Sequence, residues 1–151
     1  MRYNFQYINM ENTDPVIFPD ITWPEEGDPV DKTDETFAAT IVQQDGTLHV
    51  RFNWLMFPEV TLTLVKEGQW TLRQLIQAVN TVYVQSYECF EDSAHLIDLS
   101  DGIKLSDGSF VAVSAPVGWM LEDIRIPDGL SPLLHGVEKH TDGVWYLHWD
   151  T

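Results

Sequence analysis

The chain is poor in cysteine, lysine and long hydrophobic runs, and these shortages exclude several classes of protein. Cys89 is the only cysteine among 151 residues, which excludes a disulfide framework and a cysteine-based metal site. No stretch approaches the roughly 18 apolar residues of a membrane-spanning helix, and residues 1–7 lack the apolar core of a secretion signal. We therefore expect a cytoplasmic protein with no membrane partner.

Motifs for common catalytic and cofactor sites are also missing. The chain has no G-x-S-x-G elbow, no P-loop and no G-x-G-x-x-G fingerprint. The segment His135-x-x-Glu138-x-His140 differs by one residue from the spacing of an inverted zincin helix. Pro132 and Gly136 make a helix there unfavourable. We expect no metal, no cofactor and no catalytic residues that the sequence can identify.

Negative charge is what the sequence has in excess. The chain carries 24 acidic and eight basic residues, a formal charge of -16. Nine acids and two bases fall in residues 1–36, three and three in 37–87, and twelve and three in 88–151. Such a surface repels phosphates and anionic lipid and attracts basic proteins, so direct binding to nucleic acid is disfavoured. The alternatives are that the acidity only keeps the protein soluble or reflects a salt-adapted host.

Length and composition predict a single α+β domain over residues 1–151. At this length a fold buries roughly 70% of the unfolded chain's surface, and 44% of the residues are hydrophobic. Tyr3, Phe5 and Tyr7 alternate with polar residues, which predicts a strand with one aromatic face. Residues 12–35 hold four prolines and many acids, and predict an irregular acidic arm.

The centre of the chain predicts an antiparallel sheet packed against one helix. Asp45-Gly46 is a type I′ turn dipeptide, and alternation on both sides predicts a hairpin over 36–54, with residue 41 facing 50 and 39 facing 52. A third strand is expected over 59–66. Thr71 and Gln74 form a capping box, which starts a helix of about 72–87.

Asp-Gly recurs four more times in the C-terminal half, which predicts a β-rich region with frequent turns. The alternating runs between these turns indicate an antiparallel meander. They cover 95–99, 103–105, 110–113, 124–126 and 144–149.

The leading functional hypothesis is a non-enzymatic inhibitor that places an acidic face on a basic protein surface, for example a nucleic-acid-binding groove. Carboxylates spaced as phosphates can mimic DNA and receive charge-assisted hydrogen bonds from Lys and Arg. Phage anti-CRISPR and anti-restriction proteins and toxin-immunity proteins are of this type. The candidate partner-binding residues are Asp20, Trp23, Glu25, Glu26, Asp28, Asp31, Glu88, Glu91, Asp92, Asp98, Asp101 and Asp107.

Two other hypotheses stay open. One is a small enzyme with a dispersed site drawn from His95, His135, His140 and nearby aspartates. The other is a structural or assembly subunit. The sequence leaves the oligomeric state open.

Overall fold

The computed structural model describes residues 1–9, 17, 37–52, 59–91, 101–115 and 133–150, without the side chains of 83–91 and 150. The acidic arm predicted over 12–35 lies outside these residues, apart from Ile17, which is buried with 4% of its surface exposed. The runs predicted over 95–99 and 124–126 also lie outside them.

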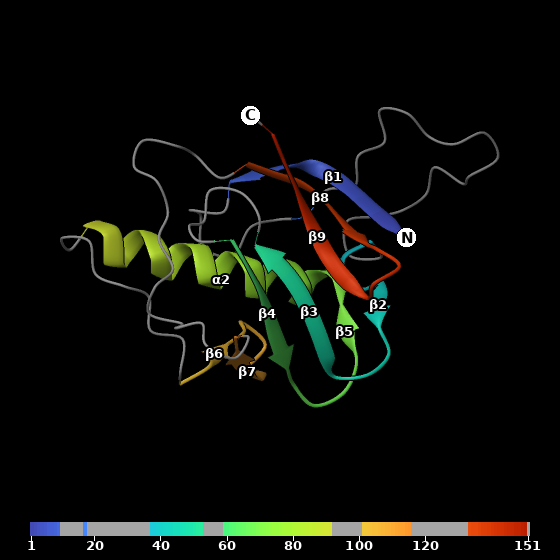
Figure 1. Cartoon of the computed structure of the whole chain (residues 1–151), viewed down its shortest axis with the longest axis horizontal. Helices are drawn as coiled ribbons and strands as arrows, with labels where there is room; N and C mark the ends of the chain where they lie inside the picture. Colours follow the sequence, from blue (N-terminus) through green and yellow to red (C-terminus); the bar gives the residue numbers. More distant parts are fainter. Residues whose placement is uncertain (10–16, 18–36, 53–58, 92–100, 116–132, 151) are drawn as a thin grey trace.

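Seven strands form one mixed sheet in the order β1-β8-β9-β3-β4-β7-β6 (Figure 1). The strands are β1 (Arg2–Asn9), β3 (Thr47–Phe52), β4 (Val60–Val65), β6 (Ile103–Lys104), β7 (Phe110–Ser114), β8 (Leu133–Lys139) and β9 (Val144–Asp150). Neighbouring strands are antiparallel except β3 and β9, which are parallel. The prediction of an antiparallel sheet is therefore wrong at its centre, although the α+β class is confirmed.

The predicted hairpin over 36–54 does not form. Strand β2 (Ile41–Gln43) pairs instead with β5 (Trp70–Thr71) in a separate two-stranded sheet, and Phe37 and Ala38 are helical. Strand β3 pairs with β4 through six consecutive residue pairs. The alternation of apolar and polar residues gives β3 an apolar face but does not specify which strand pairs with it. Strand β4 has the same alternation over its full length and is the strand that pairs with β3.

Gly46 also has a different role from the one predicted. It is not among the glycines with positive φ, as a type I′ turn would require. A Cβ atom at Gly46 would lie 1.9 Å from the carbonyl oxygen of Lys66. The Gly46 carbonyl accepts hydrogen bonds from the Lys66 amide at 3.0 Å and the Trp70 Nε1 at 2.8 Å. Glycine therefore allows the start of β3 to lie close to the end of β4.

The predicted third strand and the helix are both confirmed. Helix α2 (Leu72–Glu91) begins where the capping box places it and ends four residues beyond the predicted end. The Thr71 amide donates to Gln74 Oε1 at 3.0 Å, and the Gln74 amide donates to Thr71 Oγ1 at 3.2 Å. The apolar face of the helix is fully buried at Leu72, Leu75, Ile76, Val79 and Val82. Among the described residues, no helix is long and apolar enough to cross a membrane.

Strand β1 is confirmed, but its single aromatic face is not. Its register against β8 shifts between Asn4 and Ile8. Phe5 and Ile8 are buried with 2% and 5% exposed, whereas Tyr7 is 62% exposed. The irregularity changes which side chains face the core.

The C-terminal half is rich in strands but is not a meander. Strands β6, β7 and β9 fall in predicted runs, and Gly102 and Gly108 have positive φ on either side of β6. Strand β8 was not predicted. The β8–β9 hairpin inserts β9 between β8 and β3, which creates the parallel pair.

Helix α2 covers one face of the sheet (Figure 1). Within the described residues no helix covers the other face, which we call the open face. In β3, Leu48, Val50 and Phe52 are buried, whereas His49 is exposed and Arg51 is half-buried. The same core cluster contains three residues of β4 and two of β9, namely Val60, Leu62, Leu64, Trp145 and Leu147. The open face of the sheet therefore carries the polar side chains.

Candidate functional site

The strand register aligns a row of polar residues across the open face. Residues directly opposite each other in paired strands share a face of the sheet. The row crosses β1, β8, β9, β3 and β4, and consists of Arg2, Glu138, Tyr146, Arg51 and Thr61. Arg51 also forms an ion pair with Glu59 at 3.1 Å.

A second row begins with Asn4, Gly136 and His148. A Cβ atom at Gly136 would lie 3.0 Å from Asn4 Oδ1 and 3.6 Å from the Cβ of His148. A side chain at this position would crowd Asn4 and the Tyr3 carbonyl oxygen, which lies 3.2 Å away, whereas its contact with His148 would be ordinary. Glycine here therefore allows β1 to lie close to β8.

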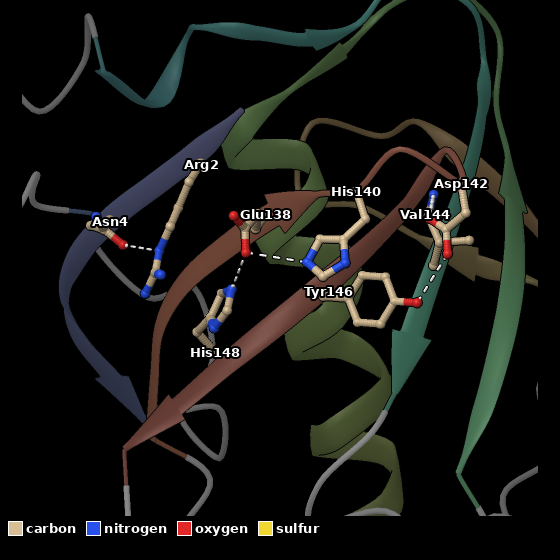
Figure 2. A network of polar contacts seen from close by, with 8 residues as sticks. All are labelled: Arg2, Asn4, Glu138, His140, Asp142, Val144, Tyr146 and His148. Carbon is tan, nitrogen blue, oxygen red and sulfur yellow. Dashed lines mark hydrogen bonds and ion pairs between the residues drawn. The ribbon is translucent and has the colours of Figure 1, made fainter.

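Glu138 is the centre of the polar cluster (Figure 2). Its Oε1 atom accepts hydrogen bonds from His140 Nε2 at 3.2 Å and from His148 Nε2 at 3.1 Å. Because an ionised carboxylate only accepts, both rings carry hydrogen on Nε2. A neutral ring in this tautomer keeps its Nδ1 lone pair as a proton acceptor.

Opposing influences set the pKa values in this cluster. Desolvation raises the pKa of Glu138, but the hydrogen bonds from His140 and His148 hold it below its ordinary value. Burial lowers the pKa of His148, and the nearby Arg2 charge lowers it further, against the contribution of Glu138. At neutral pH, Glu138 is therefore an ionised carboxylate and His148 is a neutral imidazole that Glu138 orients. A neutral imidazole held in this way can act as a general base.

The β8–β9 turn holds His140 in place. Its ring stacks on Tyr146 with centroids 3.9 Å apart and planes inclined by 20°. The Tyr146 hydroxyl donates to Asp142 Oδ2 at 3.0 Å, and the Val144 amide donates to Asp142 Oδ1 at 2.9 Å. These bonds from Val144 and Tyr146 lower the pKa of Asp142. Donation to that carboxylate raises the pKa of Tyr146.

Two further histidines lie near this cluster. The His135 ring is 6.3 Å from the His148 ring and 5.7 Å from the Tyr7 ring, between centroids. His49 is exposed, and its Nδ1 lies 3.0 Å from Thr63 Oγ1. Four of the five histidines of the chain therefore belong to strands β3, β8 and β9 or to the turn after β8.

This grouping differs from the dispersed site expected from the sequence. His135 and His140 have different ring neighbours, and His95 lies outside the described residues. His148, which was not a candidate, donates directly to Glu138 at the centre of the cluster. Pairing residues 144–149 with the segment before Asp142-Gly143 would have placed Glu138 opposite Tyr146, so the signal was present once that turn is treated as a hairpin.

The part of the chain that the structure describes contains no group of three His, Cys, Asp or Glu residues that could hold a metal ion. The His135–His140 segment lies in β8 and the turn that follows it, and not in a zincin-like helix. A pocket of about 380 Å³ lies elsewhere, between the first turns of α2 and the Ser106-Asp107 turn. None of the histidines lines it.

Most predicted partner-binding residues lie outside the described residues. These are Asp20, Trp23, Glu25, Glu26, Asp28, Asp31, Asp92 and Asp98. Glu88 and Glu91 belong to the last turns of α2, without described side chains.

Only Asp101 and Asp107 can be placed among the candidates. Asp101 is exposed in a turn. Asp107 accepts from Gln74 Nε2 at 2.9 Å and from the Ser109 amide at 2.8 Å, and both bonds lower its pKa. Its carboxylate thus stabilises a turn and joins that turn to α2.

In comparisons with known proteins, no family model, no curated protein and no solved structure matches this chain.

Proposed function

We propose that this protein is a non-enzymatic, acidic binding protein that occupies a basic site on a partner protein. The observation that carries the proposal is the division of charge along the chain. Segments 10–16, 18–36, 92–100 and 116–132 hold fourteen of the 24 acidic residues and only two of the eight basic ones. The described residues hold the other ten acids and six bases.

Part of the remaining acidity makes contacts within the fold. Of the seven acidic residues whose side chains the structure describes, five receive a hydrogen bond or form an ion pair. They are Asp45, Glu59, Asp107, Glu138 and Asp142. Most of the acidic excess of the sequence is therefore carried by the other segments, and this distribution supports our proposal that they take part in recognition.

A basic groove that normally binds nucleic acid is the partner that best fits this charge. Clustered Lys and Arg side chains would make charge-assisted hydrogen bonds to carboxylates in place of phosphates. Such a contact speeds association and weakens as salt rises. Inhibitors of the anti-CRISPR, anti-restriction and toxin-immunity types act through contacts of this kind, and we place the protein with them.

Affinity capture from a lysate of the source cells, repeated over a salt series, tests the proposal. We expect a basic, nucleic-acid-handling protein to bind at low salt and to be lost progressively as salt rises. Nucleic acid should compete with the protein for this partner. A complete absence of binding at low salt would overturn the proposal.

Charge reversal supplies a sharper test of the same idea. We expect Glu91→Lys combined with Asp92→Lys to abolish capture, as should Glu25→Lys combined with Glu26→Lys. The control is Glu67→Lys, which reverses a single charge at an exposed residue between β4 and β5, outside both acidic blocks. Capture that survives both double variants would contradict an electrostatic contact, and so would an equal loss in the control.

A further inference from the structure

Strand β1 lies at one edge of the sheet, and among the described residues only β8 pairs with it (Figure 1). Its register against β8 is regular from Arg2 to Asn4 and shifts between Asn4 and Ile8. An edge strand carries unpaired backbone groups that can pair with another chain, and an irregularity in the strand interrupts such pairing. The part of this edge that can accept a further strand is therefore residues 2–4.

The hydrogen bonds to β8 show which backbone groups of this segment face outwards. The Lys139 amide donates to the Met1 carbonyl at 2.9 Å, which makes these two residues a hydrogen-bonded pair. Hydrogen-bonded and non-hydrogen-bonded pairs alternate along an antiparallel ladder. Tyr3 therefore bonds to β8, whereas the amides and carbonyls of Arg2 and Asn4 point away from the sheet.

Core packing holds this edge in place. The Tyr3 ring stacks on the buried Trp145 with centroids 6.1 Å apart, and it lies edge-on to Phe37 at 6.4 Å. The exposed side chains of Arg2 and Asn4 are joined by a hydrogen bond of 2.8 Å from Nε to Oδ1 (Figure 2). The outward-facing backbone groups therefore belong to a strand that is already ordered, and this order lowers the entropy cost of pairing with a further strand.

We propose that residues 2–4 of β1 pair antiparallel with the same residues of a second copy of the chain, across a two-fold axis at Tyr3. In this register, Arg2 of each copy is opposite Asn4 of the other copy. Each of these two pairs exchanges two backbone hydrogen bonds, so every outward amide and carbonyl of Arg2 and Asn4 finds a partner. The contact joins one surface to itself, which is the arrangement of a two-fold dimer. It goes beyond the proposed function and does not depend on it.

The side chains favour this register over its neighbours. A shift that places Arg2 opposite Arg2 of the second copy would bring like charges together, and a shift that places Asn4 opposite Asn4 would extend the pairing into the irregular part of the strand. In the proposed register, Tyr3 faces Tyr3 of the second copy, and such aromatic pairs stabilise a sheet. Met1 is 72% exposed, and its sulfur accepts from the Tyr3 hydroxyl at 3.0 Å, so the second copy would cover it.

Charge also favours this part of the surface for a contact between two copies. The whole chain has a formal charge of -16, so two copies repel each other. Residues 1–9 contain Arg2 and no acidic residue, so the repulsion is weak at this edge. A contact through residues 2–4 is small, and we therefore expect a reversible dimer. Salt should strengthen it by screening the repulsion between the chains.

Sedimentation equilibrium at high salt, over a series of protein concentrations, tests the dimer. We expect the wild-type chain to dimerise reversibly and Asn4→Pro to abolish the dimer. Proline at this position removes an amide that points away from β8, so the pairing of β1 with β8 is retained. A wild-type chain that stays monomeric up to the concentrations used for NMR would overturn the proposal, and so would a dimer that survives Asn4→Pro.

The matched control is Lys104→Pro in β6, at the opposite edge of the sheet. The Leu105 amide donates to the Ser109 carbonyl at 2.9 Å, so the same alternation directs the amide of Lys104 away from β7. Lys104 is exposed, as Asn4 is. We expect Lys104→Pro to leave the dimer intact. An equal loss in this control would show that the effect is not specific to β1 and would overturn the proposal.

Hydrogen exchange followed by NMR locates the interface in the unmodified chain, without dependence on the folding of a variant. The amides of Arg2 and Asn4 should exchange more slowly as the protein concentration rises, because they become bonded in the dimer. The Tyr3 amide is bonded to β8 and should be protected at all concentrations. A chain that dimerises while Arg2 and Asn4 exchange equally fast at low and high concentration has its interface elsewhere, which would overturn the proposal.

Discussion

At the scale of single residues, two buried tryptophans show how equal burial conceals unequal bonding. Trp70 and Trp145 are both 0% exposed. The Nε1 of Trp70 donates to the Gly46 carbonyl at 2.8 Å, and Lys66 Nζ lies 5.4 Å from its ring centroid. Within the described residues, the Nε1 of Trp145 has no hydrogen-bond partner. The bonding partner of Trp70 is 24 residues away in the sequence and cannot be predicted from spacing.

This difference predicts unequal effects of the same substitution. Trp70→Phe removes a hydrogen bond as well as ring volume, whereas Trp145→Phe removes ring volume and an unpaired buried donor. We expect Trp70→Phe to lower the free energy of unfolding by about 1 kcal/mol more than Trp145→Phe. Urea unfolding of both variants measures this difference. Equal losses would show that the Trp70 bond contributes nothing beyond packing.

At the scale of the elements, the sequence predicts the helix and individual strands well but predicts poorly which strands pair with each other. Helix α2 is encoded by the Thr71–Gln74 capping box and an apolar stripe, both within a few residues of each other. The partner of β3 is not local, because its alternation fits β2 and β4 equally well and its second partner is β9. The Asp45-Gly46 dipeptide added a misleading signal, since Gly46 is needed for close approach to Lys66.

The capping box itself can be tested. Thr71→Ala removes the oxygen that accepts from the Gln74 amide at 3.2 Å and leaves that donor without its cap. We expect Thr71→Ala to lower the free energy of unfolding, measured in urea, by about 1 kcal/mol. Thr71→Ser keeps the accepting hydroxyl and should avoid most of this loss. A loss as large for Thr71→Ser as for Thr71→Ala would attribute the effect to the Thr71 methyl group.

At the scale of the whole molecule, topology brings together what the sequence keeps apart. Arg2 and Glu138 come from opposite ends of the chain and meet only because β1 pairs with β8. No local pattern encodes that contact, so the polar cluster was only partly visible as the His135–His140 segment. The charge division, in contrast, is a property of composition and could be predicted in full, although its purpose is still a proposal.

The same charge makes a prediction for the stability of the whole molecule. With a formal charge of -16, repulsion among carboxylates opposes the compact state, and dissolved salt screens it. The screening length falls from about 10 Å at 0.1 M salt to about 3 Å at 1 M. We therefore expect Tm, measured by differential scanning calorimetry at pH 7.5, to rise with sodium chloride and then level off. Charge reversal at Glu25 and Glu26 should reduce this rise, because fewer repulsive pairs are left to screen. A Tm that is independent of salt would mean that the acidic segments are too far from each other and from the fold to repel, and that their charge acts only on partners.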